Sequence, residues 1–377
     1  MSGRSRRRVL AVVRNPVGGI RNYIKYTYGA LDPAVYGYTV LAVKSDESAH
    51  LRADLEPLNA RVVEVESPRA LTREAIREAR SGFHDLIHSH GLKSGSAASP
   101  AAWTSRLPHV ITSHDVFLPE QFSGPKGLPM KIFLTAILNR SSAVHSVSAG
   151  ADRNLGEYLP RVKPELRHVV LNGIPAGPTD DPEESHRWRS QMAPGGETLF
   201  GFFGRFMPQK GFEYVIAAAE KLQADPQTKG RFRVVAVNDG SYVREYRALV
   251  EKRGLGERFV FAGFFPQARR LMGRVDAVLM PSLWEACGLV AMEAMSAGAP
   301  LISTAVHGLA DVTAASPAII IEPRNAESLA RGMKTLMAGV GKRTEAALAF
   351  SSTAAQRFDI RASAAGLEKI FDRVLIR

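Results

Sequence analysis

Short apolar stretches alternate with segments of helical periodicity along the whole chain. In the first half, β-branched and aliphatic residues predict strands at 9–14, 38–44, 60–65, 85–89, 109–113, 143–148 and 168–171. In the second half they predict strands at 199–203, 233–237, 259–262, 277–281, 300–304 and 318–321. Helical patterns lie between them, at 22–31, 71–81, 212–224, 242–253, 267–273, 289–296 and 326–337. Strands that are apolar throughout, rather than at alternate positions, are typical of parallel sheets with helices on both faces.

Because this alternation occurs twice, the chain is predicted to be an α/β protein with two doubly wound domains. Residues 174–197 separate them, since this stretch holds four prolines, three glycines and an acidic cluster. We therefore expect a first domain at 1–175, a linker at 176–196 and a second domain from 197 onwards. Open parallel sheets bind ligands at the carboxyl ends of their strands, so the functional site is expected between the two domains.

Length and composition agree with a globular protein of two domains. A chain of 377 residues exceeds one ordinary core, and 45% hydrophobic with 23% charged residues excludes a disordered composition. No apolar stretch approaches the roughly 20 residues of a membrane span. The run 9–13 is too short for a signal peptide, and a single cysteine, Cys287, excludes internal disulfides. These features predict a cytoplasmic protein.

The chain is basic, with a net charge of +12 from 49 Lys and Arg against 37 Asp and Glu. Such an excess attracts the phosphates of nucleotides, nucleic acids or anionic lipids. A nucleic-acid-binding protein should carry dense basic clusters, and only the segment 4–8 is dense. We interpret that segment as a solvated tail and expect no nucleic-acid partner.

A loop bracketed by glycines follows the predicted strand 199–203. It runs from Gly204 to Gly211 and carries Arg205 and Lys210. Arg205 offers a fork of donors and Lys210 a point charge, and together they suit a diphosphate. A surface turn with two solvated cations is the alternative, and these residues alone do not decide between the two. The glycine spacing does not match the dinucleotide fingerprint, which argues against an oxidoreductase.

The segment after strand 277–281 adds two carboxylates. Glu285 lies in a loop, Gly288 allows close approach of the backbone, and a helix begins near Leu289. The free amides at the start of that helix favour an anion, and Glu293 lies one turn further on. Two carboxylates next to a phosphate site would repel the phosphate, so we expect them to bind neutral hydroxyls of the same ligand. The segment therefore favours a nucleotide-sugar over a bare phosphate. Two solvated glutamates are the alternative.

The loop 204–211 and the Glu285-x7-Glu293 segment resemble the signature of retaining glycosyltransferases of family 4, in the glycogen-synthase-like GT-B superfamily. Residues 171–175 resemble the end of that family's first domain, 261–266 its base-binding loop, and 357–359 its closing helix region. The resemblance implies a GT-B fold, with two Rossmann-like domains that face each other across a cleft. It also implies a second domain at 197–355 and a C-terminal helix, 356–377, that packs back towards the first domain.

The resemblance assigns roles to individual residues. Arg205 and Lys210 would bind the diphosphate, Glu285 the hydroxyls of the transferred sugar, and Glu293 the ribose. His114 matches the family's cleft histidine, and it completes a predicted catalytic set with Glu285, Arg205 and Lys210. The predicted donor-binding residues are Gly18, Gly19, Gly204, Phe264, Cys287, Gly288, Leu289, Val290 and Glu293.

Two positions depart from the family pattern. Ala286-Cys287 stands where Pro-Phe is frequent, and His307-Gly308 stands where paired glycines are frequent. The first departure leaves the sugar preference open. We interpret Cys287 as a small apolar loop residue rather than a reactive thiol.

The first predicted domain supplies candidates for the acceptor side. Gly18 and Gly19 allow close backbone approach and resemble the family loop that meets the diphosphate and the acceptor. Arg21 and His90 are acceptor-side candidates, although a solvated arginine is an equal reading of Arg21. His88, His90 and His114 lack a fourth ligand and the spacing of a zinc site, so no metal is expected.

Residues 129–140 combine six large apolar side chains with Lys131 and Arg140, and Lys126 lies just ahead. This composition suits peripheral contact with an anionic membrane, and an ordinary helix that covers the sheet is the alternative.

Taken together, these features predict a metal-independent, retaining glycosyltransferase that moves a hexose-type sugar from a UDP- or GDP-linked donor. The expected acceptor is a saccharide or lipid-linked saccharide of bacterial cell-surface polysaccharide or oligosaccharide synthesis. The enzyme would act in the cytoplasm or at the inner face of the plasma membrane, without a cofactor beyond the nucleotide-sugar co-substrate. Two alternatives remain, a nucleotide-sugar 2-epimerase-type isomerase on the same fold and a sugar- or nucleotide-binding protein without catalysis.

Overall fold

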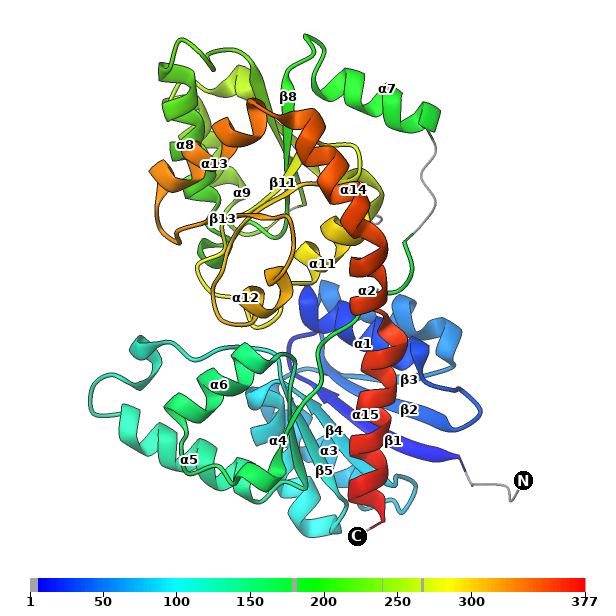
Figure 1. The fold of residues 1–377 in the computed structure, drawn as a ribbon. Helices are drawn as coiled ribbons and strands as arrows, with labels where there is room; N and C mark the ends of the chain where they lie inside the picture. The colour runs from blue at the N-terminus through cyan, green and yellow to red at the C-terminus, as the bar shows by residue number, and fades with distance from the viewer. Residues whose placement is uncertain (1–5, 178–181, 239, 266–267, 377) are drawn as a thin grey trace. The chain divides into compact units, whose positions relative to one another are not determined.

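The structure, a computed structural model, describes residues 6–177, 182–238, 240–265 and 268–376 (Figure 1). The chain divides into two compact units. The first combines Met1–Pro175 with Asp359–Arg377, and the second is Ala176–Phe358. Each unit is an α/β domain built on its own parallel sheet, which confirms the predicted fold class.

The first unit contains a seven-stranded parallel sheet in the order β3-β2-β1-β4-β5-β6-β7. Its strands are β1 (Arg7–Val13), β2 (Tyr36–Val43), β3 (Arg61–Val65), β4 (Leu86–His90), β5 (His109–Ser113), β6 (Ala143–Ser146) and β7 (Arg167–Val169). Its helices are α1 (Gly19–Ala30), α2 (Asp46–Leu55), α3 (Pro68–Ala79), α4 (Leu92–Ser105), α5 (Gly127–Asn139), α6 (Ala149–Tyr158) and α15 (Ile360–Leu375).

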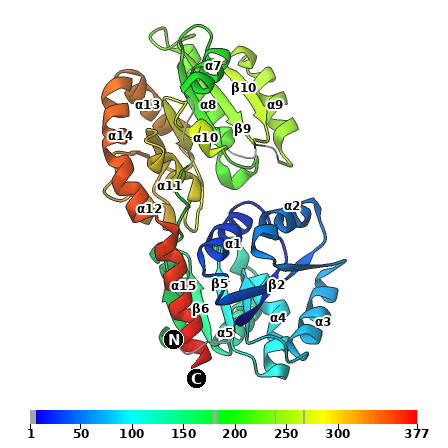
Figure 2. The ribbon, with the colours of Figure 1, turned by 90° about the vertical axis from the view of Figure 1, so that its right-hand side faces the viewer.

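Alternate residues of β1 face two different layers of helices. Val9, Ala11 and Val13 belong to an apolar cluster with residues of α1 and α15, whereas Leu10 and Val12 belong to a cluster with α3 and α4. Both clusters are buried, which explains why β1 is apolar at every position from Val9 to Val13. The closing helix α15 lies beside α1 (Figure 2), so the end of the chain returns to the first unit.

The second unit contains a six-stranded parallel sheet in the order β10-β9-β8-β11-β12-β13. Its strands are β8 (Thr198–Phe203), β9 (Phe232–Val237), β10 (Phe259–Gly263), β11 (Ala277–Met280), β12 (Leu301–Thr304) and β13 (Ile319–Ile321). Its helices are α7 (Pro182–Met192), α8 (Phe212–Ala224), α9 (Val243–Lys252), α10 (Arg269–Met272), α11 (Leu289–Ser296), α12 (Gly308–Thr313), α13 (Ala326–Met337) and α14 (Val340–Arg357).

Aromatic side chains dominate one face of this second sheet. Phe200, Phe202, Phe206, Phe212 and Phe232 are buried in a single cluster with residues of α8, α9 and α13. Phe206 and Phe212 meet edge to face, with ring centroids 5.0 Å apart. Because Phe206 lies within the loop after β8 and Phe212 is the first residue of α8, this packing holds the loop against the start of the helix.

All thirteen predicted strands are present, most within two residues of their predicted bounds. Several helices carry no clear signal in the sequence. Helix α4 is rich in Ala, Ser and Gly and contains Pro100, yet small residues let it pack closely, with Gly95 against Ile111. The stretch predicted as a linker, 176–196, contains α7, because prolines and acidic residues occur in the first turn of a helix as well as in linkers. Linker residues 178–181 lie outside the described part of the chain.

Helices α14 and α15 meet near the residue predicted to end the second domain. Helix α14 ends at Arg357, and α15 begins at Ile360 with Asp359 as its cap.

Among the described residues, no helix is both long enough and apolar enough to cross a membrane.

Candidate functional site

Each unit carries a polar cluster at the carboxyl ends of its central strands. In the second unit the cluster comes from the loops after β8 and β11, which are neighbours in the sheet. Lys210 Nζ donates a hydrogen bond to Glu285 Oε2 at 2.6 Å, and their side chains are only 19% and 14% exposed. The hydroxyl of Ser282 lies 3.4 Å from the same carboxylate oxygen. The two predicted donor segments are therefore joined by a partly buried ion pair.

Backbone contacts hold these two loops in register. The amide of Leu283 donates to the carbonyl of Gln209 at 2.8 Å, and the Gln209 side-chain amide donates to the Trp284 carbonyl at 3.0 Å. Gly211 has φ +69°, and a Cβ there would lie 2.2 Å from the Pro281 carbonyl oxygen. No residue except glycine fits this position without movement of the second loop.

Glycine is also required where the second loop turns into α11. Gly288 precedes the helix at φ +93°, and a Cβ there would lie 2.8 Å from Leu309 Cδ1. The Gly308 amide donates to the Glu285 carbonyl at 3.1 Å, so the loop that begins α12 supports the same turn. The amides of Leu289 and Val290 open α11, and the first N–H groups of a helix favour an anionic ligand.

Arg205 follows β8 and is half-buried. In contrast to Lys210, it forms no ion pair or hydrogen bond with any residue that the structure describes. Its guanidinium is thus not neutralised by a described carboxylate and can meet an anion. Gly204, the residue before it, donates its amide to the Val237 carbonyl at 3.4 Å and keeps the start of the loop close to β9.

The other predicted donor-binding residues differ in how far their side chains are exposed to solvent. Glu293 lies in the second turn of α11 and is buried, so its carboxyl group lies inside the unit. The side chains of Ala286 and Cys287 are buried as well, which leaves only their backbone to face a ligand. Phe264, after β10, is 52% exposed. Residue 266, the end of the loop predicted to bind the base, and residue 267, the start of the helix predicted at 267–273, lie outside the described residues.

In the first unit, the loop after β1 leads directly into α1. Gly18 precedes the helix with φ +52° and ψ −120°, a conformation that side chains disfavour, and Gly19 opens the helix. Arg21, predicted on the acceptor side, instead donates to Glu47 at 2.9 Å and lies 3.2 Å from Asp54. These ion pairs join α1 to α2, so the structure gives Arg21 a bridging position.

Four histidines of the first unit belong to one network of hydrogen bonds. His88 and His90 come from β4, His145 from β6, and His114 follows β5. Tyr28, from α1, lies 2.8 Å from His88 and 2.9 Å from His90. His90 in turn lies 3.3 Å from His114. Tyr28 was not singled out from the sequence, although His88 and His90, two residues apart on one face of β4, indicate a polar cluster at this strand end.

Burial keeps these histidines neutral. It lowers the pKa of His114 to about 3 and that of His145 to about 4, and it holds the pKa of His88 and His90 well below the usual value. At neutral pH each imidazole therefore has one N–H and one bare nitrogen. Among the described residues, no group of three His, Cys, Asp or Glu side chains is arranged to hold a metal ion.

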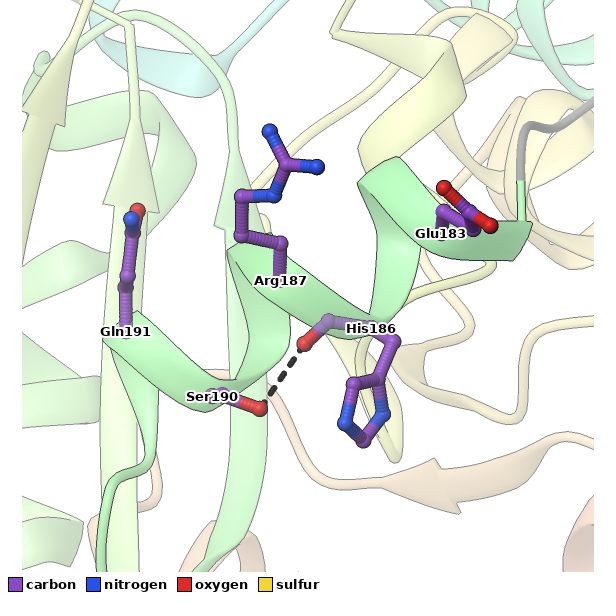
Figure 3. Close-up of a pocket in the computed structure, with 5 residues that line it drawn as sticks. All are labelled: Glu183, His186, Arg187, Ser190 and Gln191. Carbon is purple, nitrogen blue, oxygen red and sulfur yellow. Dashed lines mark hydrogen bonds between the residues drawn. The ribbon is translucent and has the colours of Figure 1, made fainter.

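A shallow depression lies elsewhere, along one face of α7. Glu183, His186, Arg187, Ser190 and Gln191 line it (Figure 3), and Ser190 donates to the His186 carbonyl at 2.9 Å. All its lining residues come from one helix, and none is a predicted site residue. The cluster around Lys210 and Glu285 remains the candidate site of the second unit.

Two family models match the chain in succession. The model described as "Glycosyl transferase 4-like domain" matches residues 18–173, and the model described as "Glycosyl transferases group 1" matches residues 184–354. The first match begins at Gly18, and the second contains Arg205, Lys210, Glu285 and Glu293.

Individual relatives agree with these models. The chain is 33% identical over 263 residues to a 2-deoxystreptamine N-acetyl-D-glucosaminyltransferase of Streptomyces fradiae, a match to 66% of this chain and 61% of the relative. A 2-deoxystreptamine glucosyltransferase of Streptomyces kanamyceticus is 31% identical over 54% of this chain and 51% of its own length. A D-inositol 3-phosphate glycosyltransferase of Jonesia denitrificans is 27% identical over 81% of this chain and 75% of its own length. The matches thus span about three fifths and about half of the first two relatives.

Solved structures share the fold over nearly the full chain. Anabaena HepE in complex with UDP-glucose superposes with a TM-score of 0.83 at 21% identity, over 97% of this chain and 99% of that one. The sucrose-phosphate synthase of Thermosynechococcus elongatus superposes with a TM-score of 0.79 at 18% identity, over 98% of this chain and 100% of that one. At these identities the likeness establishes the architecture, the GT-B fold of two Rossmann-like domains.

Proposed function

Because the chain belongs to the group 1 glycosyltransferases with a family 4-like N-terminal domain, we propose that it transfers a hexose-type sugar from a nucleotide diphosphate sugar to an acceptor. We further propose that the reaction retains the configuration at the anomeric carbon and needs no metal ion. The 2-epimerase-type alternative has no observation in its favour.

The ion pair between Lys210 and Glu285, next to the start of α11, carries this proposal. A cation, a helix N-terminus and a carboxylate are brought together at adjacent strand ends. The cation and the helix amides suit a diphosphate, while the carboxylate suits the sugar hydroxyls next to it. A bare phosphate would gain nothing from Glu285, whereas a nucleotide-sugar presents both kinds of group.

The proposed transfer reaction requires stabilisation of the diphosphate leaving group. As the sugar–phosphate bond breaks, positive charge builds at the anomeric carbon and negative charge on the leaving group. Arg205, Lys210 and the amides of Leu289 and Val290 would stabilise that negative charge, the task that a metal ion performs in other enzymes. In the retaining reaction, the acceptor hydroxyl attacks from the leaving group's own face and a phosphate oxygen takes its proton. Glu293 would bind the ribose hydroxyls.

For the donor we propose a uridine diphosphate sugar, with a guanosine diphosphate sugar second. The solved complex of Anabaena HepE with UDP-glucose has the same fold and supports the first choice. A thermal-shift screen with UDP-, GDP-, ADP- and TDP-sugars tests it, because a ligand that binds the native state raises its melting temperature. NMR of the product from the stabilising donor then reads the anomeric configuration, and an assay in excess EDTA tests metal independence.

For the acceptor we propose a polyhydroxylated molecule. A saccharide or lipid-linked saccharide of cell-surface polysaccharide synthesis is one class. The names of the Streptomyces and Jonesia relatives, which specify 2-deoxystreptamine and inositol 3-phosphate, add cyclitols as a second class. Assaying the two classes separately distinguishes them, since only the true acceptor accelerates release of the nucleoside diphosphate above the rate of hydrolysis.

For location we propose the cytoplasmic face of a membrane, with α5 as the contact. Leu128, Met130, Ile132 and Phe133 on α5 are all 45–68% exposed, which is unusual for large apolar side chains. Lys131 lies over the rings of Phe122 and Tyr158, so cations accompany the apolar surface. Co-sedimentation with anionic vesicles should fall sharply when Ile132 and Phe133 become Ser. Unchanged sedimentation of that variant would remove the membrane from the proposal.

A further inference from the structure

Five buried side chains of the first unit form one continuous chain of hydrogen bonds that ends on His114. The chain begins at the carbonyl of Val170 and passes in turn through His145, Thr112, His88, Tyr28 and His90. Along it, the successive distances between hydrogen-bonding atoms are 3.1, 3.0, 2.7, 2.8, 2.9 and 3.3 Å. All five intervening side chains are at most 2% exposed, so water does not compete for these bonds.

The direction of the first bonds follows from the Val170 carbonyl, which can only accept. His145 therefore donates from Nε2, and as a neutral ring it accepts at Nδ1. The Thr112 hydroxyl must be the donor to that nitrogen, and its single proton is then used. Thr112 Oγ1 consequently accepts from the Nε2–H of His88.

The same reasoning continues through Tyr28 to the end of the chain. His88 accepts at Nδ1, so the Tyr28 hydroxyl donates to it and accepts from the Nε2–H of His90. His90 is left with a bare Nδ1, and the Nε2 of His114 must donate to it. His114 therefore carries its proton on Nε2. Its Nδ1 is a bare acceptor, which has no hydrogen-bond partner in the part of the chain that the structure describes.

The opposite direction fails at His145. If every proton pointed the other way, His145 would donate from Nδ1 to Thr112 and still donate from Nε2 to Val170. Both nitrogens would then be protonated, and the ring would be a buried cation. Burial lowers the pKa of His145 to about 4, so this cation is not populated at neutral pH. Only one arrangement of protons remains.

We propose that this chain of hydrogen bonds fixes His114 as the Nε2–H tautomer, so that its Nδ1 accepts a hydrogen bond from a neutral sugar hydroxyl, with Tyr28 as a positioning residue that acts through His90. The identity of the ligand rests on the proposed function, whereas the tautomer rests on the protein alone. A bare nitrogen offers no proton to a phosphate or carboxylate oxygen, so this position selects the polyol part of a substrate. The edge of the Tyr23 ring, with centroids 4.8 Å apart, supports the His114 ring from the side.

Nitrogen NMR of the histidine side chains tests the tautomer without any substrate. In the wild-type protein at neutral pH, Nε2 of His114 should show a directly bonded proton and Nδ1 should resonate as an unprotonated nitrogen. Tyr28→Phe breaks the chain in its middle, so His90 and His114 should each become a mixture of tautomers. A wild-type His114 that carries its proton on Nδ1 would overturn the proposal.

Tyr38→Phe is the matched control. The ring of Tyr38 stacks on Tyr28 with centroids 4.2 Å apart, and its buried hydroxyl has no hydrogen bond among the described residues. This variant loses the same atom from the same cluster, yet it should leave the His114 spectrum and the rate of transfer unchanged. If Tyr28→Phe does not fold, Thr112→Val breaks the chain at a second position with nearly the same volume and should give the same mixture.

Kinetics complete the test. Tyr28→Phe should lower kcat/KM about tenfold for the natural donor and much less for a donor analogue that lacks the hydroxyl bound by His114. An equal loss with every deoxy analogue would overturn the role of Nδ1. If the wild-type protein shows the expected tautomer but turns over no nucleotide-sugar, the proposed function fails while the tautomer assignment stands.

Discussion

Lys210 and Glu285 lie 75 residues apart in the chain, yet their side chains meet at 2.6 Å because β8 and β11 are adjacent in the sheet. We expect Lys210→Ala and Glu285→Gln each to lower the rate of transfer by a hundredfold or more, since each removes a contact with the leaving group or the transferred sugar. Both variants should keep the far-UV circular dichroism of the wild type.

An exposed pair of the same type provides the control for this prediction. Lys221 lies 2.9 Å from Glu327 on the surface of the same unit, with both side chains about half exposed. Lys221→Ala should therefore leave the rate unchanged. Full activity in Lys210→Ala would contradict the assignment of the donor site.

Arg205 should contribute to the same charge stabilisation without any structural role, because no described residue pairs with it. Arg205→Ala should leave the free energy of unfolding in urea within about 0.5 kcal/mol of the wild type, as surface substitutions usually do. It should also weaken binding of a nucleoside diphosphate measured by calorimetry. Arg205→Lys should restore only part of that affinity, since it loses the two-pronged contact. Unchanged affinity in Arg205→Ala would place the diphosphate elsewhere.

Gly211 and Gly230 both have positive φ, but only Gly211 has no room for a side chain. Gly230→Ala should lose about 1 kcal/mol of unfolding free energy from the backbone conformation alone. Gly211→Ala should lose clearly more and also lose transfer, because its Cβ would displace the Pro281 carbonyl at the start of the Glu285 loop. Urea unfolding of the two variants measures the difference, and equal losses would mean that the loop moves freely.

The neutral histidines should make the protein less stable in acid. Since the folded pKa of His145 is about 4 and its usual value is about 6.5, the unfolded chain binds the extra proton between these pH values. The contribution of His145 is fully present above pH 6.5 and falls with decreasing pH, with a slope of up to about 1.4 kcal/mol per pH unit down to about pH 4. His145→Gln should reduce that slope by up to about 1.4 kcal/mol per pH unit, because one fewer proton is bound on unfolding. A slope that is unchanged in His145→Gln would contradict this prediction, because it would show that the buried network does not exclude protons.

Arg21 should matter for stability rather than for transfer. Its ion pairs with Glu47 and Asp54 join α1 to α2. Arg21→Ala is expected to cost up to about 1 kcal/mol of unfolding free energy and to leave the KM for the acceptor unchanged. A raised KM for the acceptor with unchanged stability would contradict this and would support the prediction from the sequence that Arg21 binds the acceptor.

The features of the fold and of the candidate site that could be predicted are those that depend on residues close together in the sequence. Uninterrupted apolar runs, such as 9–13 in β1 and 199–203 in β8, indicate a parallel sheet covered on both faces. The segments around Lys210 and Glu285 carry family-specific spacing. Helix α4 was not predicted, because its buried residues are small and form no apolar stripe. The ion pairs of Arg21 were not predicted either, because its partners lie on the next helix.

The strands and helices along the chain, the two-domain plan and the residue types of the donor site could all be predicted from the sequence, since these depend on neighbours a few positions apart. Which side chains meet depends on the tertiary structure. It joined Lys210 to Glu285, gave Arg21 to Glu47, and placed the hydroxyl of Tyr28 between His88 and His90. The reason is that strand order and helix packing set these distances, and neither is written in the spacing of residues along the chain.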